Sequence, residues 1–432
     1  MERDGRADLK SMTLPELTEY LKDLGEKPFR AKQLYQWMHV KLAASLDEMT
    51  NLSKEMRGIL KETAFYASLN PVDVRISQID GTRKYLFELE DGNVIESVLM
   101  RYKHGNSVCI SSQVGCRMGC RFCASTLDGL ERNLRPSEML EQIYRIQRDI
   151  GERVSNVVVM GSGEPMDNYD NLIRFIHLLT DENGLHISQR NVTVSPCGIV
   201  PRIRQFAEEN LQVTLALSLH APNDEVRKTL MPVANSFALK DVLDACHYYF
   251  EKTGRRLTFE YSLVKGVNDN LDEARALADL LKGQHGHVNL IPVNPIKERD
   301  FNSRIGRLSR SLNSIWKSGE SMSPCAGKWA ATLTEPADSF EKAILRRKGR
   351  KEDESLCFDG HRAGAACKPG LPLRHDRAYR TSFKFIYCCR RYGRPQGRRP
   401  GLQASDREPD LLHKELFDQN AGGGAEPWNC GG

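Results

Sequence analysis

Residues 116–123 read Cys-Arg-Met-Gly-Cys-Arg-Phe-Cys, which places three thiols in C-x3-C-x2-C spacing directly after an apolar, strand-like run. Thiols this close in sequence lie on one loop, and no fourth cysteine follows shortly afterwards. A metal centre held there therefore keeps one coordination position open. Structural zinc sites close their shell with four ligands, and two-cluster ferredoxins add a fourth cysteine soon after the third. The alternative of a zinc knuckle or of buried structural thiols is therefore disfavoured.

An aromatic residue between the last two cysteines, here Phe122, is typical of the radical S-adenosylmethionine (SAM) enzymes, and this loop resembles theirs. In those enzymes three cysteines bind a [4Fe-4S] cluster, whose free iron is chelated by the amino and carboxylate groups of SAM. Reductive cleavage of SAM yields a 5'-deoxyadenosyl radical, so the cofactor supplies the chemistry and the protein directs it. The resemblance implies that Cys116, Cys120 and Cys123 bind the cluster.

Length, composition and charge limit the class of protein. The 432 residues leave room for two or three domains with a large core. No apolar run is long enough to cross a bilayer and the N-terminus lacks the apolar region of a secretory signal, which predicts a cytoplasmic protein with no membrane partner. Cluster-binding thiolates also favour a reducing compartment. Residues 301–432 hold 24 Lys+Arg against 15 Asp+Glu, so the net charge of +5 is no evidence for nucleic-acid binding by the rest of the chain.

Residues 1–80 predict a small helical accessory domain for RNA binding, followed by a linker. Thr13-Leu14-Pro15-Glu16 is a typical helix start, and Ser53 is placed to cap a later helix. Basic residues between them either face RNA or, more commonly, lie in solvent opposite a packed aromatic stripe. Residues 81–105 alternate in polarity around Asp91-Gly92-Asn93, a pattern typical of a β-hairpin.

Residues 106–300 alternate between short apolar runs and amphipathic stretches. The expected strands are 108–111, 156–160, 192–195, 213–218, 257–263 and 288–293. The expected helices are 136–149, 169–179, 240–252 and 271–282. Strand followed by helix, repeated about six times, predicts parallel pairing with right-handed crossovers. We therefore expect an α/β fold containing a partial (βα)6 barrel, with its site at the C-terminal ends of the strands.

Polar residues come directly after several of these strands. Gly161-Ser162-Gly163-Glu164-Pro165 follows the second strand, where radical SAM enzymes carry a GGE element that contacts the SAM amino group. A turn with a capping glutamate is the alternative. Ser195, residues 218–220 and Asn294 close later strands. Each signal is weak by itself, but together these residues surround one mouth of the predicted barrel.

Longer stretches resemble one family within this superfamily. They are Ser111-Ser112-Gln113-Val114-Gly115-Cys116, Leu217-Ser218-Leu219-His220-Ala221-Pro222-Asn223 and Asn289-Leu290-Ile291-Pro292-Val293-Asn294-Pro295. These stretches resemble the RlmN/Cfr family of radical SAM RNA adenine methyltransferases, in its RlmN branch. The resemblance implies methylation of C2 of an adenine in 23S rRNA, and of an adenine next to the anticodon in some tRNAs. It also implies an electron donor such as flavodoxin or ferredoxin. A C8 methyltransferase of the Cfr type is the alternative within the family.

The resemblance also assigns roles to individual residues. The residues that would hold SAM are Gly163, Glu164, Ser195, Ser218, Leu219, His220 and Asn294. Glu96 matches the family's proton acceptor, and Cys109 matches the thiol that helps to release the product. By pattern alone, these two read as an exposed hairpin charge and a buried strand thiol. In this family one SAM methylates a protein cysteine, and a second supplies the radical that moves this methylene onto the base.

The resemblance does not extend into residues 301–432. The family's methyl-carrying cysteine lies in a motif like R-E-M-G-x-D-I-D-G-A-C-G-Q-L-R, which the chain lacks. A disordered tail is the ordinary interpretation, and the chain would then be an inactive remnant that binds SAM and RNA. However, joining each codon's third base to the next two bases from Gly327 permits Glu-Met-Gly-Ser-Asp-Ile-Asp-Gly-Ala-Cys-Gly-Gln-Leu-Arg-Lys, with the cysteine spanning Pro336 and Ala337. Our hypothesis is a frameshift near Phe301.

Overall fold

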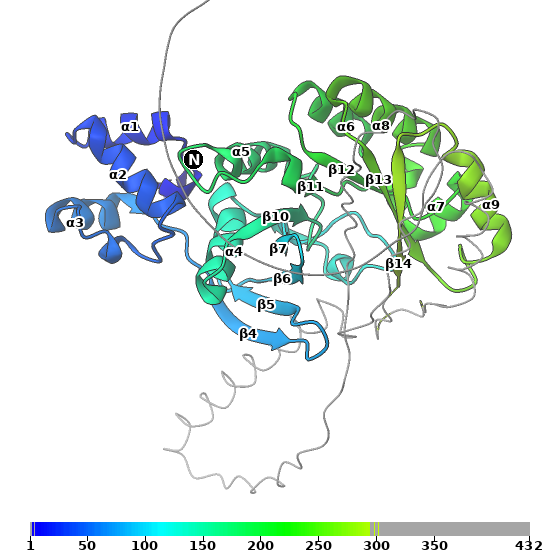
Figure 1. The fold of residues 1–432 in the computed structure, drawn as a ribbon, viewed down its shortest axis with the longest axis horizontal. Coiled ribbons are helices and arrows are strands. Elements are labelled where there is room, and N and C mark those ends of the chain that lie inside the picture. The colour runs from blue at the N-terminus through cyan, green and yellow to red at the C-terminus, as the bar shows by residue number, and fades with distance from the viewer. Residues whose placement is uncertain (1, 4, 294–297, 299–300, 302–432) are drawn as a thin grey trace, which may run out of the picture. The chain divides into compact units, whose positions relative to one another are not determined.

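The computed structural model of the protein describes residues 2–3, 5–293, 298 and 301 (Figure 1). Asn294, a predicted SAM contact, lies outside the described residues. The same holds for residues 302–432, and therefore for the predicted tail and the out-of-frame cysteine motif.

The N-terminal region is helical, as the sequence predicts, and contains α1 (Leu14–Asp23), α2 (Pro28–His39) and α3 (Lys54–Thr63). The first begins with a capping box, in which the Glu16 carboxylate accepts a hydrogen bond from the Thr13 amide at 2.8 Å. Ser53 caps α3 by accepting from the Met56 amide at 3.1 Å. A small sheet of β1 (Glu2–Arg3), β2 (Arg6–Asp8) and β3 (Ala64–Phe65) was not predicted, because strands of two or three residues have no readable periodicity.

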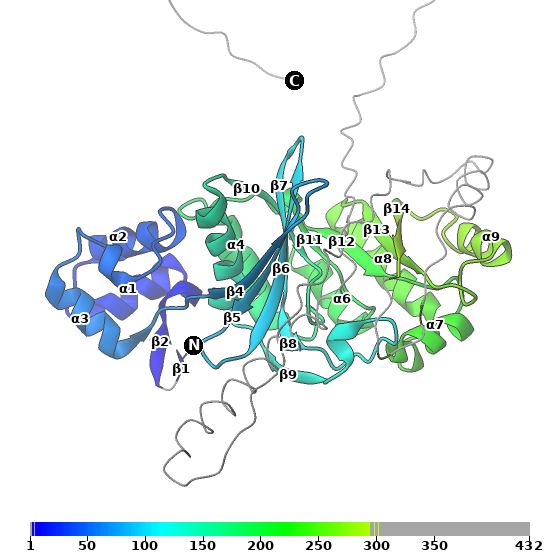
Figure 2. The same cartoon turned by 90° about the horizontal axis from the view of Figure 1, so that it is seen from below.

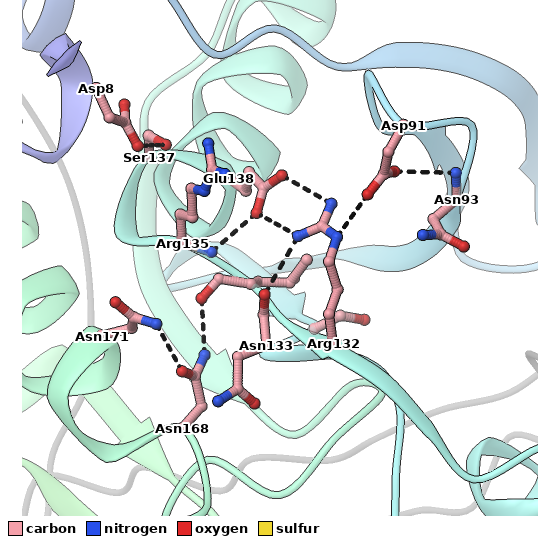
Figure 3. A network of polar contacts seen from close by, with 12 residues as sticks. Asp8, Asp91, Asn93, Arg132, Asn133, Arg135, Ser137, Glu138, Asn168 and Asn171 are labelled. Atoms are coloured by element: carbon pink, nitrogen blue, oxygen red, sulfur yellow. Dashed lines mark hydrogen bonds and ion pairs between the residues drawn. The ribbon is translucent and has the colours of Figure 1, made fainter. Parts of the chain in front are cut away.

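Buried polar contacts attach this region to α4 (Pro136–Ile150), the first helix of the barrel. The Lys10 ammonium lies 2.7 Å from the Glu141 carboxylate, and both side chains are fully buried. Ser137 donates to Asp8 at 2.6 Å, on the same helix (Figure 3). These ion-pair and hydrogen-bond contacts fix the N-terminal region against the barrel.

The main sheet contains all six parallel strands that the sequence predicts. They are β7 (Gly105–Ile110), β10 (Val154–Val159), β11 (Val192–Val194), β12 (Thr214–Ser218), β13 (Leu257–Leu263) and β14 (Gly286–Pro292). Each pairs in parallel with the next along the chain. Within the described residues β14 forms one edge of the sheet, which confirms the partial barrel and its α/β class.

The predicted hairpin is present as β5 (Arg83–Glu88) and β6 (Val94–Tyr102), and it continues the barrel sheet. β6 pairs antiparallel with β7, and β4 (Asn70–Ile76) adds the outermost strand beyond β5 (Figure 2). The sequence prediction missed β4 by treating it as linker. Its Val72, Val74 and Ile76 do alternate with polar residues, and Pro71 fits a strand at the edge of a sheet.

The helices of the barrel include the four that the sequence predicts, α4, α5 (Tyr169–Thr180), α8 (Leu239–Thr253) and α9 (Leu271–Leu280). Two further helices, α6 (Val200–Glu208) and α7 (Asp224–Leu230), were not predicted because they are short. Figure 1 shows α6 and α8 beside β12 and β13. No helix in the described part of the chain has both the length and the apolarity needed to cross a bilayer.

Strand β13 shows how the sheet separates core from site. Phe259 and Tyr261 belong to the hydrophobic core, whereas the alternate residues Glu260 and Ser262 line a cavity inside the partial barrel. Because successive side chains of a strand point to opposite faces, β13 contributes side chains both to the hydrophobic core and to the cavity. The same cavity is lined by residues at the C-terminal ends of β10 and β12, as the sequence predicts for the site.

Candidate active site

The cysteine loop is held between two short strands, β8 (Gln113–Gly115) and β9 (Leu130–Asn133). Gly115 has a φ of 71° and a Cβ there would collide with the carbonyl oxygen of Gly129, so this position requires glycine. At the next residue, the Cys116 amide donates to the same Gly129 oxygen at 2.7 Å. The close crossing of the two chains closes the base of the loop.

Arg132 of β9 connects the β8–β9 strand pair to the neighbouring helix and hairpin (Figure 3). Its two terminal nitrogens each donate to a carboxylate oxygen of Glu138 on α4 at 2.9 Å. Its Nε donates to Asp91 in the turn between β5 and β6. The bidentate pair is a rigid, charge-assisted contact. On the other side, Asn168 donates from Nδ2 to the carbonyl oxygens of Ser112 and Leu134, at 2.9 and 2.8 Å. The cysteine loop therefore has a fixed position relative to the hairpin and the barrel.

All three predicted cluster ligands line the cavity, Cys116 and Cys120 as buried residues and Cys123 as a partly buried one. Burial raises the pKa of the Cys116 thiol to about 12, and the neighbouring cysteine and carboxylate charges add to this rise. The pKa of Cys120 is raised for the same reasons. Thiolates at this place therefore require a compensating positive centre.

The arrangement discriminates between a single metal ion and a cluster. Among the described residues, no three His, Cys, Asp or Glu side chains converge closely enough to hold one metal ion. A single zinc needs its ligands at about 2.3 Å from one point. A [4Fe-4S] cluster instead spreads its cysteine ligands over different iron atoms. Three thiols on one loop that line one cavity fit a cluster whose iron atoms take separate cysteine ligands.

The Gly161–Pro165 segment brings a carboxylate to the same cavity. Gly163 has a φ of 106°, and a Cβ there would lie 2.6 Å from Cβ of Gln113. This close approach allows the Glu164 amide to donate to Gln113 Oε1 at 2.8 Å. The Glu164 carboxylate accepts from the amides of Cys197 at 2.8 Å and Met166 at 3.0 Å. Burial raises the pKa of Glu164 to about 7, against the lowering effect of these bonds. An arriving ammonium group would stabilise its ionised form.

Ser195 and Ser218, at the ends of β11 and β12, lie side by side on the wall of the cavity. Their hydroxyl oxygens lie 3.4 Å apart, and both residues line the cavity. Leu219 differs, because its side chain packs in the hydrophobic core and its amide donates to the Glu260 carbonyl oxygen at 3.0 Å. The structure therefore brings the two serines to the site and leaves the Leu219 side chain outside it.

His220 also lines the cavity and adopts a strained backbone with a φ of 57°. Its Nδ1 accepts a hydrogen bond from the Ser262 amide at 3.0 Å, so the ring proton of the neutral imidazole lies on Nε2. Burial lowers the pKa of His220 to about 3, which keeps the ring neutral. Its ring packs against Phe122 of the cysteine loop in a T-shaped arrangement, with the ring centroids 4.8 Å apart. His220 is thus a fixed hydrogen-bond donor next to the cluster loop.

Glu96 and Cys109 are brought to this cavity from β6 and β7. The reading of Glu96 as an exposed hairpin charge is wrong, because only 12% of its side chain is exposed and its carboxylate is paired with Lys84. The reading of Cys109 as a buried thiol is confirmed, and this thiol also borders the cavity. Burial raises the pKa of Glu96, and burial together with the Glu96 charge raises the pKa of Cys109 to about 12.

Two buried ionisable residues, one lining the cavity and one beside it, were missed by sequence reasoning. Glu260 in β13 accepts from Asn289 at 2.8 Å, and burial raises its pKa to about 8. Its Oε1 has no hydrogen-bond partner within the described part of the chain. Arg227 of α7 is fully buried and donates to the carbonyl oxygens of Cys197 at 2.6 Å and Leu219 at 3.2 Å. A charge in the middle of the apolar run 257–263 was the available signal for Glu260.

Family comparisons agree with this geometry. Residues 110–281 match the model of the radical SAM superfamily, and residues 7–65 match that of the ribosomal RNA large subunit methyltransferase N-terminal domain. A crystal structure of a radical SAM methyltransferase from Sphaerobacter thermophilus is similar, with a TM-score of 0.70 and 40% identity, covering 74% of this chain and 96% of that one. The chain is therefore a radical SAM enzyme, and its cofactors are SAM and the [4Fe-4S] cluster.

Individual relatives define the family more narrowly. A probable dual-specificity RNA methyltransferase RlmN from Lachnospira eligens is 68% identical over 294 residues, 68% of this chain and 84% of the relative. One of the same name from Lachnoclostridium phytofermentans is 62% identical over 310 residues, 72% of this chain and 87% of the relative. The chain belongs to the RlmN family of radical SAM RNA methyltransferases.

Proposed function

We propose that this protein methylates C2 of an adenine in 23S rRNA, and C2 of an adenine next to the anticodon in tRNA. The observation that carries the proposal is the presence of a largely buried carboxylate, Glu96, on the wall of the cavity that the three cysteines also line. Two relatives named as dual-specificity RNA methyltransferases support two RNA substrates. A cytoplasmic location follows from these substrates and from the need for reduced thiols.

SAM would be held by groups on three strand ends. The Glu164 carboxylate is placed to accept hydrogen bonds from the SAM ammonium, because it is ionisable, buried and fixed by two backbone amides. Ser195 and Ser218 offer hydroxyls, and His220 offers an Nε2 proton. Cys116, Cys120 and Cys123 would bind the cluster, and a flavodoxin or ferredoxin would reduce it. When bound, the cluster and SAM supply a carbon-centred radical, which methylation at C2 requires because this carbon is not nucleophilic.

The residues of the chain would handle the proton. A methyl group replaces the hydrogen on C2, so this hydrogen must leave as a proton at some point in the reaction. Glu96 is the group we assign to accept it, through its carboxylate oxygen. Cys109 on the adjacent strand borders the same cavity, and we assign it the role of the thiol that assists product release. A thiol with a pKa of about 12 remains protonated at neutral pH and reacts only when a base takes its proton.

The methyl-carrying cysteine is the missing part of this proposal. The 432-residue chain matches its Lachnospira relative over 294 residues, which is compatible with a frameshift near Phe301. Sequencing the gene across codons 290–350 tests this directly. An inserted or deleted base that restores the cysteine motif would support a complete methyltransferase. If the printed reading frame is correct, the chain should bind the cluster and SAM without methylating RNA.

The function itself is tested with the reconstituted protein. The printed chain and a frame-corrected version would be incubated with SAM, a reductant and either a 23S rRNA fragment or tRNA, and the digested nucleosides analysed by mass spectrometry. Formation of 2-methyladenosine by the corrected version is the expected result. Formation of 8-methyladenosine would show instead the Cfr type of reaction. Absence of both products, with an intact cluster and bound SAM, would refute the proposed activity.

A further inference from the structure

Lys84 and Glu96 form a buried ion pair across two neighbouring strands of the sheet. Lys84 Nζ lies 2.8 Å from Glu96 Oε2, and only 8% and 12% of the two side chains are exposed. Both residues line the cavity that holds the cysteine loop. Neither the family motifs nor the comparisons assign a role to Lys84.

The register of the strands explains why the pair faces the cavity. Lys84 on β5 lies opposite Val98 on β6, and Val98 lies opposite Cys109 on β7. Glu96 is two residues from Val98 and therefore shares its face. The other face of β6 points to α4, where Ser97 donates to Gln142 at 2.7 Å. The ion pair and Cys109 thus lie on one surface, away from the hydrophobic core.

The groups around the Glu96 carboxylate come from three neighbouring strands, β4, β5 and β7. Lys84 comes from β5, and Arg75 of β4 acts through its charge. Cys109 comes from β7, and its thiol remains neutral because its pKa is about 12. From the following loop, Ser111 donates its hydroxyl to the Glu96 backbone carbonyl at 2.7 Å, which fixes the strand without contacting the carboxylate. Lys84 is therefore the cation in direct contact with the carboxylate.

A base must be ionised before its substrate arrives. Burial raises the pKa of Glu96, and the charge and hydrogen bond of Lys84 oppose this rise. A carboxyl group buried without a cation has a raised pKa, so a larger fraction of it is protonated at neutral pH and cannot accept a further proton.

We propose that Lys84 is a positioning residue of the reaction, which holds the Glu96 carboxylate ionised and oriented in the cavity. The inference rests on the proposed role of Glu96. In the step concerned, the C2–H bond of the adenine breaks, its electron pair stays with the base ring, and the proton moves to Glu96. The resulting neutral acid lies beside the Lys84 ammonium, which favours return of the proton to solvent and restores the carboxylate.

A purely structural role for Lys84 is the competing explanation, and the molecule contains a matched control. Lys10 and Glu141 form another fully buried Lys–Glu pair, with the atoms 2.7 Å apart, between the N-terminal region and α4. Removing either lysine should destabilise the fold, because each change breaks a buried ion pair, although Glu141 keeps Arg148 as a second cation. Only removal of Lys84 should alter the ionisation of Glu96.

The experiment follows the Glu96 carboxyl directly by NMR of the full chain labelled with 13C at glutamate Cδ, with the signal assigned from Glu96→Gln. Lys84→Met should raise the titration midpoint of Glu96 by about one to three pH units, at least a tenfold change in proton affinity. Lys84→Arg should restore the midpoint, and Lys10→Met should leave it unchanged. An unchanged midpoint in Lys84→Met would overturn the proposal.

A second variant and the pH dependence of methylation test the proposal if Lys84→Met does not fold. If Lys84→Met does not fold, Lys84→Gln keeps a polar side chain and should show the same rise in midpoint. In the methylation assay, the pH dependence of the rate should move to higher pH by the same amount as the NMR midpoint. The NMR result stands even if RNA methylation fails, so the two proposals fail separately. Full methylation by Glu96→Gln would refute both roles, because neither a base nor its positioning lysine would then be needed.

Discussion

Replacing Glu260 by glutamine should stabilise the apo protein, and the gain should grow with pH. Burial raises the pKa of Glu260 from 4.5 to about 8, so the folded state holds a proton that the unfolded state releases at neutral pH. The buried carboxyl therefore destabilises the folded protein at neutral pH. The free energy of unfolding falls progressively as the pH rises from about 4.5 to about 8. At pH 7 the cost is about 3 kcal/mol, since one pKa unit corresponds to roughly 1.4 kcal/mol. Glutamine preserves the shape and the acceptor for Asn289 without carrying this cost.

The measurement is denaturant unfolding of wild-type protein and Glu260→Gln at several pH values between 4 and 8. The two proteins should have nearly the same free energy of unfolding at pH 4, and the variant should be more stable by about 3 kcal/mol at pH 7. Glu182→Gln, in an exposed turn, is the control and should change little at any pH. A stability difference that does not vary with pH would refute the reasoning, because it would show that Glu260 is ionised in the folded state.

Three other substitutions test the site. Cys120→Ala should abolish the visible absorbance and the iron content of the reconstituted cluster, and a retained spectrum would contradict the ligand assignment. Glu164→Gln should weaken SAM binding roughly 10- to 100-fold in calorimetry, the value of a charge-assisted hydrogen bond of about 1.5–3 kcal/mol; equal affinity would show that the carboxylate does not contact the ammonium. Gly163→Ala would place a Cβ 2.6 Å from Cβ of Gln113 at a φ of 106° and should lower the free energy of unfolding by about 2 kcal/mol or more, whereas wild-type stability would show that the segment can move.

The sequence predicted the barrel strands because each carries an apolar run, although β11 has only three residues. β13, for example, is a seven-residue run that is buried throughout. The missed elements lacked such a signal. α7 spans seven residues and α6 nine, too few for a helical period to repeat clearly. Strand β4 alternates in polarity, but an exposed edge strand gains its structure from its neighbour β5, which the sequence of β4 does not contain.

The candidate site was predictable where its residues are close together in sequence. The cysteine spacing and the Gly161–Pro165 segment carry their chemistry in one loop each. Glu96 was found through family resemblance, and its partner Lys84 is set by the antiparallel register of two strands. Arg227 was not predictable, because a buried guanidinium is tolerated only where folded loops present carbonyl oxygens to it. Such partners come together only after folding.

The continuity of the sheet from the barrel into the hairpin has a consequence for the RNA. Glu96 lies on a strand that shares backbone hydrogen bonds with β7, the strand that leads to the cysteine loop, and Arg132 clamps the hairpin turn to the same loop. Glu96, the proposed proton acceptor, is therefore held on the same continuous sheet as the strand that leads to the cysteine loop. A nucleobase stacked in a duplex cannot enter a buried cavity, and extruding it costs a few kcal/mol. Under the proposed function, the moving part of the reaction is the substrate, so the enzyme should select adenines by how easily their strand unstacks before it reads any sequence.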